Sequence, residues 1–93
     1  MPHPNSARSP IKVTLYRYPL FASVIRRLFL KSEGFRNICE DYVLSVETLA
    51  RFESLPDAAY RTEIPEYKRV IRELEVEILS DLQNERQHNG GSK

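Results

Sequence analysis

Few residues in this sequence are able to do covalent chemistry. Cys39 is the only cysteine, and the two histidines, His3 and His88, stand near the two ends of the chain. A catalytic cysteine needs a lowered pKa and a nearby histidine base. Because both histidines fall in segments that we expect to be flexible, and Cys39 lies between the apolar residues Ile38 and Tyr42, we predict a buried structural thiol.

The acidic residues and the glycines offer no second route to catalysis. A helical di-metal centre needs carboxylates that face the core. Five acids instead fall mostly outside the apolar helix faces: Glu40, Asp41, Glu47, Glu73 and Glu77. The only Gly-Gly pair, at 90–91, stands near the end of the chain, so no glycine-rich loop is expected to hold a phosphate. We therefore predict no enzyme activity, no cofactor and no metal site.

Length and composition indicate one small domain. The chain has 93 residues, of which 41% are hydrophobic and 29% charged, as in folded proteins. No apolar run approaches the roughly 18 residues of a membrane helix, and the first ten residues contain no apolar segment typical of a secretory signal. The single cysteine excludes an internal disulfide, and we expect a reducing, cytoplasmic location.

Charge is distributed unevenly along the chain. Residues 1–31 contain no acid and carry six cations, Arg8, Lys12, Arg17, Arg26, Arg27 and Lys31. Residues 32–93 carry a charge of −5, which leaves a net charge of +1. We expect the basic segment to lie against the acidic remainder. The alternative is a surface for nucleic acid, acidic lipid or an acidic partner, although so small a net charge attracts polyanions weakly.

Two long amphipathic segments predict an antiparallel helical hairpin. At helical spacing, the apolar residues of 34–55 share one face: Phe35, Ile38, Cys39, Tyr42, Val46, Leu49 and Ala50. Those of 65–85 do the same: Tyr67, Val70, Ile71, Leu74, Ile78 and Leu82. The polar connection 56–64 is short enough to place the helices antiparallel, with Phe52 meeting Tyr67 at one end.

A shorter helix is predicted at 20–31, after Pro19. Its apolar face holds Leu20, Phe21, Val24, Ile25, Leu28 and Phe29, and Ser32 and Gly34 are expected to end it. We expect this face to dock on the hairpin. The alternative is that the helix lies on an anionic membrane, and we do not expect such contact.

The ends of the chain are expected to lack a packed core. Residues 1–19 read as an extended or disordered arm, in which the alternation at 11–18 favours a single strand that needs a partner strand. Residues 86–93 form a polar tail expected to be disordered. The prediction is thus an all-α domain at 20–85 with flexible termini.

Two segments carry a resemblance to known proteins. The helix with Phe35, Ile38, Cys39, Asp41 and Tyr42 matches the pattern F-x-x-[IL]-C-x-D-Y, and Glu66-Tyr67 with 74–78 matches E-Y…L-E-x-E-I. In these patterns, which span about 20–82, the chain resembles short uncharacterised bacterial proteins. The resemblance implies a helical hairpin and no particular reaction.

These observations favour a non-catalytic protein–protein interaction or adaptor module, with a homodimer as one form. Candidate contact residues are Lys12, Arg17, Arg26, Arg27, Leu44 and Val76. Cys39 and Tyr42 are predicted to pack, and Asp41 to face solvent or to bond a base of the first helix.

The alternative function is DNA binding. A strand, a proline-started helix, a glycine turn and a second helix resemble the element order of ribbon-helix-helix dimers. In such a dimer Lys12, Thr14 and Tyr16 would face the bases.

Overall fold

The computed structural model describes residues 8–91, and their side chains up to residue 88. Along the chain lie α1 (Pro10–Arg17), η1 (Pro19–Phe21), α2 (Ala22–Lys31), α3 (Glu33–Glu53), η2 (Ala58–Tyr60) and α4 (Glu63–Gly91), where η marks a 3-10 helix. No strand occurs within residues 8–91. The predicted all-α fold is confirmed.

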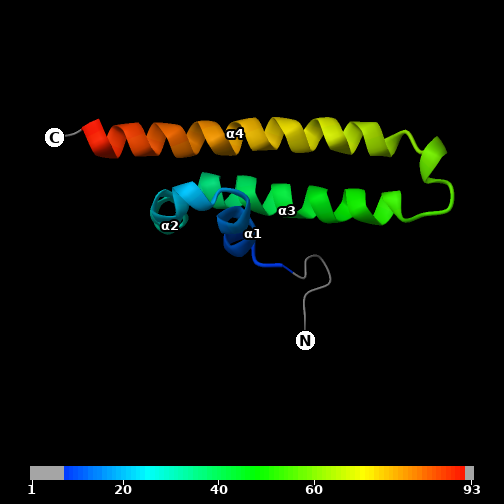
Figure 1. The fold of residues 1–93 in the computed structure, drawn as a ribbon, viewed down its shortest axis with the longest axis horizontal. Coiled ribbons are helices and arrows are strands. Elements are labelled where there is room, and N and C mark those ends of the chain that lie inside the picture. Colours follow the sequence, from blue (N-terminus) through cyan, green and yellow to red (C-terminus); the bar gives the residue numbers. More distant parts are fainter. Residues whose placement is uncertain (1–7, 92–93) are drawn as a thin grey trace.

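Helices α3 and α4 form the predicted antiparallel hairpin (Figure 1). The connection between them contains η2, and the rings of Phe52 and Tyr67 pack beside it with centroids 5.7 Å apart. At the other end Ile78 and Leu82 of α4 are fully buried in the same core cluster as Tyr42 of α3. The apolar faces therefore meet along the hairpin as their spacing predicts.

Ser32 alone separates α2 from α3. Its backbone N–H donates to the carbonyl of Leu28, which closes α2, and its hydroxyl accepts from the backbone N–H of Phe35 at 3.0 Å, which caps α3. Gly34 lies inside the first turn of α3 and does not act as a helix break. The helix start is therefore set by the serine cap.

Residues 10–17 form a helix, so the predicted strand at 11–18 and the extended arm are wrong there. Ser9 caps α1 by accepting from the backbone N–H of Lys12 at 3.4 Å, and Pro10 takes the first helical position. A lone strand would leave its backbone groups without partners, whereas a helix pairs its own. Residues 1–7 of the predicted arm lie outside the described residues.

The far end of α4 also differs from expectation. Residues 86–91 of the predicted disordered tail continue α4, and residues 92–93 lie outside the described part of the chain. The 29-residue helix thus extends past its last buried apolar residue, Leu82.

Helix α2 docks on the hairpin as expected, with Val24, Ile25 and Leu28 buried. Leu20 was expected on the same face but is 91% exposed. It lies in η1, where residues turn by about 120° rather than 100°, so the α-helical face does not extend back to it.

The core occupies one end of the hairpin. Among the side chains that the structure describes, every buried apolar one falls in the stretches 24–28, 35–43 or 78–82. Helices α1 and α2 pack against this end, and neither covers the end near η2 (Figure 1). We call residues 33–43 and 75–91 the capped half of the hairpin, and residues 44–74 the open half.

Candidate functional site

Cys39 is buried, and its thiol is expected to react slowly. The residue is fully inaccessible on α3, as predicted. Burial raises the pKa of the Cys39 thiol to about 11, an effect that outweighs the lowering by Thr14 beside it on α1. Because only a thiolate is a good nucleophile, this thiol is poorly suited to covalent catalysis at neutral pH.

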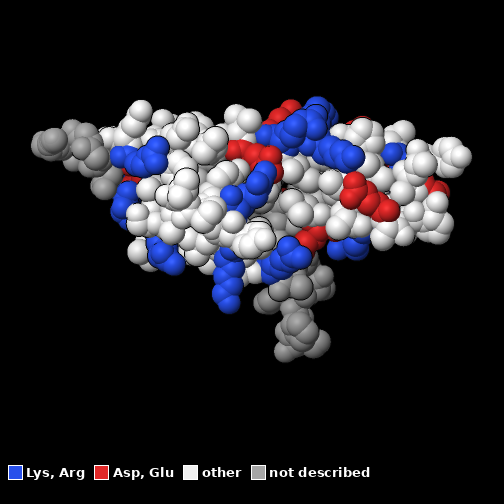
Figure 2. All heavy atoms as spheres, in the orientation of Figure 1, with Lys and Arg blue, Asp and Glu red and all other residues white. Residues whose placement is uncertain are grey.

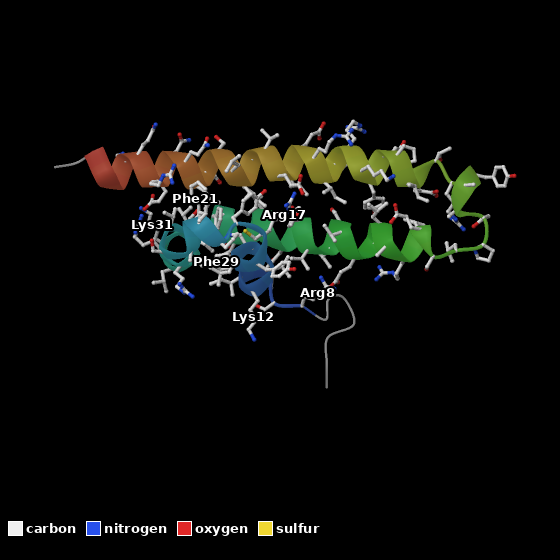
Figure 3. All side chains as sticks on the ribbon, in the orientation of Figure 1. Arg8, Lys12, Arg17, Phe21, Phe29 and Lys31 are labelled. Carbon is white, nitrogen blue, oxygen red and sulfur yellow. The ribbon has the colours of Figure 1, made fainter. Side chains whose placement is uncertain are left out.

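A polar contact joins three helices in the capped half. The Tyr42 hydroxyl of α3 donates to Glu75 Oε2 of α4 at 2.9 Å. Arg17 of α1 reaches between the two helices (Figure 3) and donates from Nε to the Tyr42 oxygen and from Nη2 to Glu75 Oε2, both at 3.2 Å. Burial raises the pKa of Tyr42, which keeps the phenol protonated and able to donate. The contact fastens α1 to the hairpin.

A second polar contact fastens α2 to the capped half. Glu85 of α4 accepts from Lys31 Nζ at 3.0 Å and pairs with Arg27 Nε at 3.3 Å. The hydrogen bond from Lys31, together with Arg27, lowers the pKa of Glu85. Beside this pair the Arg86 guanidinium lies 4.6 Å from the centre of the Phe21 ring, within cation–π range.

These contacts confirm that the basic segment lies against the acidic body. Arg17, Arg27 and Lys31 face the carboxylates of Glu75 and Glu85 across helix boundaries. Arg17, Arg27 and Lys31 therefore have structural partners on α4, and Arg17 and Arg27 act here as internal contacts.

The remaining acids show no arrangement suited to metal binding. Asp41 is exposed, as predicted, and burial followed by the nearby Glu77 raises the pKa of Asp81. Glu85 and His88 have the Glu-x-x-His spacing used in di-metal bundles, but Lys31 and Arg27 occupy the Glu85 carboxylate. Within the described residues no group of three histidine, cysteine or acidic side chains is placed to hold a metal ion.

The predicted contact residues do not share one surface. Lys12 and Arg26 are exposed on α1 and α2. Leu44 follows Tyr42, which faces α4, by about 200° of helical turn, so it points away from α4. Val76, 69% exposed, is similarly turned from the buried Ile78. Val76 thus lies on the outer side of α4, and Leu44, which is partly buried, lies on the side of α3 turned away from α4.

Burial changes along a single line of α3. Cys39, Val43, Val46 and Ala50 follow one another at intervals of four, three and four residues, so they share one face. Cys39, beside Thr14 of α1, and Val43 are fully buried, Val46 is partly buried, and Ala50 is exposed. Apolar side chains in the open half, Leu49, Phe52, Tyr67, Val70 and Ile71 among them, are partly rather than fully buried, and Ile71 packs against the edge of the core cluster. The open half is an apolar strip that the described helices cover incompletely.

The comparisons with known proteins give no relative for this chain: no family model, no curated protein and no solved structure matches it. Among the described helices, none combines the length and the apolar character needed to cross a bilayer.

Proposed function

We propose that the protein is a non-catalytic protein–protein interaction module whose contact surface is the open half of the hairpin. The observation that carries this proposal is the loss of cover along one line of α3, from the buried Cys39 to the exposed Ala50. In the capped half, α1 packs on that line. The partner that fits is an amphipathic helix whose apolar face packs on the open half, as α1 packs on the capped half.

A second copy of the chain is the simplest source of that helix. Two open halves related by a twofold axis would each present the same apolar strip to the other, as in a four-helix bundle. Small domains commonly gain missing burial by oligomerising. The buried, unreactive Cys39 suits a module that works in the reducing cytoplasm.

Cross-linking tests the contact surface directly. A photo-reactive benzoylphenylalanine at position 50 should give an adduct of twice the chain mass. The same residue at position 37, which is exposed on another side of α3, should not. An adduct of a different mass at position 50 would show that the partner at this surface is another protein and not a second copy of the chain. The absence of any adduct at position 50 would refute the proposal.

A charge substitution supplies an independent test. Ala50→Glu should convert a dimer to a monomer in sedimentation equilibrium at tens of micromolar, because it buries a charge in the apolar contact. Asn37→Glu adds the same charge to the same helix and should leave the dimer intact. Circular dichroism should show unchanged helix content in both variants, since both positions are exposed in the single chain.

A further inference from the structure

Three large apolar side chains stand out from α1, η1 and α2. Tyr16 is 88% exposed, Leu20 is 91% exposed and Leu30 is 85% exposed. Single exposed apolar residues are ordinary on protein surfaces. These three fall within fifteen consecutive residues, on elements that contact one another at one end of the hairpin.

The same elements carry an excess of positive charge. Residues 9–31 hold five cations and no acid, and the carboxylates that three of them contact, Glu75 and Glu85, bring only two negative charges. In the space-filling view the surface over α1 and α2 is mostly uncharged, and the charged side chains seen on it are mainly cations (Figure 2). Lys12 points away from the hairpin (Figure 3), and Arg26 is exposed on α2.

The apolar and basic side chains alternate on the outer sides of the two helices. Lys12 and Tyr16 are one turn apart on α1, opposite the fully buried Thr14. Arg26 and Leu30 are likewise one turn apart on α2, turned away from the buried Val24 and Leu28. Because the inner faces are packed in the core, these outer side chains are presented by a rigid layer.

We propose that the outer surface of α1, η1 and α2 binds an anionic lipid bilayer. Tyr16, Leu20 and Leu30 enter the boundary between headgroups and acyl chains, and Lys12 and Arg26 lie among the phosphates. This binding needs no unfolding of the core, and its residues are separate from those of the open half. The proposal therefore extends the proposed function without depending on it.

The shape and chemistry of the surface favour lipid over other polyanions. A protein partner needs a recess for each protruding side chain, whereas a bilayer accepts isolated apolar projections wherever they fall. Nucleic acid gains little from exposed leucines, because its affinity comes from phosphate contacts and stacked aromatic rings. Two leucines beside exposed cations match an interfacial lipid contact.

Co-sedimentation of the full chain with vesicles tests the proposal. Binding is expected to vesicles of phosphatidylcholine and phosphatidylserine in equal amounts, and not to phosphatidylcholine alone. Raised salt should weaken it. Leu20→Ser with Leu30→Ser should lower the partition coefficient by at least about tenfold, since apolar insertion is lost. Lys12→Ala with Arg26→Ala should lower it by a similar factor, about fivefold for each cation.

Matched controls lie on the open half. Tyr60→Ser removes an equally exposed aromatic ring near the η2 tip, and Arg72→Ala removes an exposed cation of α4. Both should bind vesicles as the wild type does, and so should Ala50→Glu, which tests the protein contact instead. Circular dichroism checks that each variant is folded.

Several results would overturn the proposal. They are no binding to either vesicle, equal binding to both, or unchanged binding after either double substitution. Binding to duplex DNA without binding to the anionic vesicles would assign the surface to nucleic acid and would refute it equally.

Discussion

The capped and open halves of the hairpin are built from the same two helices with the same apolar spacing, yet only one of them has a closed core. Ile71 and Ile78 lie on one face of α4, seven residues apart, and Ile78 is fully buried inside the core cluster whereas Ile71 is partly buried at its edge. The spacing of the apolar residues decides which side of each helix faces the other helix. Whether that side becomes fully buried depends on a third layer, which α1 and α2 supply in the capped half.

The polar contacts differ between the halves in the same way. In the capped half Tyr42, Glu75 and Glu85 bond to α1 or α2 with limited solvent access. In the open half the ion pairs are exposed, such as Lys68 with Glu53 at 3.8 Å and Arg69 with Glu73 at 3.4 Å. Exposed pairs of this kind contribute little. We therefore expect local opening to begin in the open half.

The largest contrast should appear in thiol reactivity. At a concentration low enough to keep the chain monomeric, native Cys39 should react with iodoacetamide at least about a thousandfold slower than a cysteine placed at position 50 in a Cys39→Ser, Ala50→Cys variant. Reaction of Cys39 requires the core to open, and its raised pKa leaves little thiolate. The two rates should converge in urea. Equal rates in the native state would mean that the two halves do not differ in closure.

Truncating Ile78 in the capped half should lower the free energy of unfolding more than truncating Ile71 in the open half. Ile78→Ala should lower the free energy of unfolding by about 3–4 kcal/mol, because it leaves a cavity in a closed core. Ile71→Ala should cost about 1–2 kcal/mol, since its site is only partly buried, at the edge of the core, and can relax. Urea denaturation measures both values. A larger loss for Ile71→Ala would reverse the comparison.

The two tyrosines of the hairpin test the polar difference. Tyr42→Phe should cost about 1–2 kcal/mol, because Glu75 and Arg17 lose their shared partner. Tyr67→Phe should change stability by less than about 0.5 kcal/mol, since its ring packs on Phe52 and keeps that contact. Thermal unfolding of the pair at one pH is sufficient. Similar losses of stability in the two variants would show that the hydrogen bonds of the Tyr42 hydroxyl do not stabilise the fold.

The smallest effect should be a pH dependence at Glu85. Because Lys31 and Arg27 lower the pKa of Glu85 in the folded chain, its carboxylate stabilises the fold above the ordinary carboxyl pKa. That contribution is lost as the pH falls through the folded pKa. Glu85→Gln should therefore lower the melting temperature near neutral pH, and the difference from wild type should vanish in acid. Glu73→Gln, in an exposed pair, should change little at either pH.

The long helices could be predicted because each carries a repeated apolar face, and even the Phe52–Tyr67 contact followed from their spacing. Helix α1 was missed because residues 11–18 alternate as a strand would. The signals for a helix were present in the Ser9-Pro10 start and in the spacing of Ile11, Leu15 and Tyr18.

The candidate surfaces could be predicted only in part. The Arg17 contact with Tyr42 and Glu75 depends on the angle at which α1 crosses the hairpin, and no local pattern encodes that angle. Leu44 and Val76 are level along the hairpin, but level positions on two packed helices can face opposite sides, as they do here. Exposure of Leu20 followed from a 3-10 turn that its sequence does not distinguish from an α-helical one.

The junction at Ser32 fixes the angle between α2 and α3. Across the junction the rings of Phe29 and Phe35 pack edge to face with centroids 5.6 Å apart, and Arg36 donates to the Phe29 carbonyl, so the corner between α2 and α3 has little freedom to bend. The 21 residues of α3 extend about 30 Å from that corner. A protein bound to the open half near η2 is therefore kept at a fixed distance and direction from a bilayer bound to α1 and α2. Inserting about seven residues, close to two helical turns, into both α3 and α4 would lengthen that distance by about 10 Å and keep the packed faces nearly aligned.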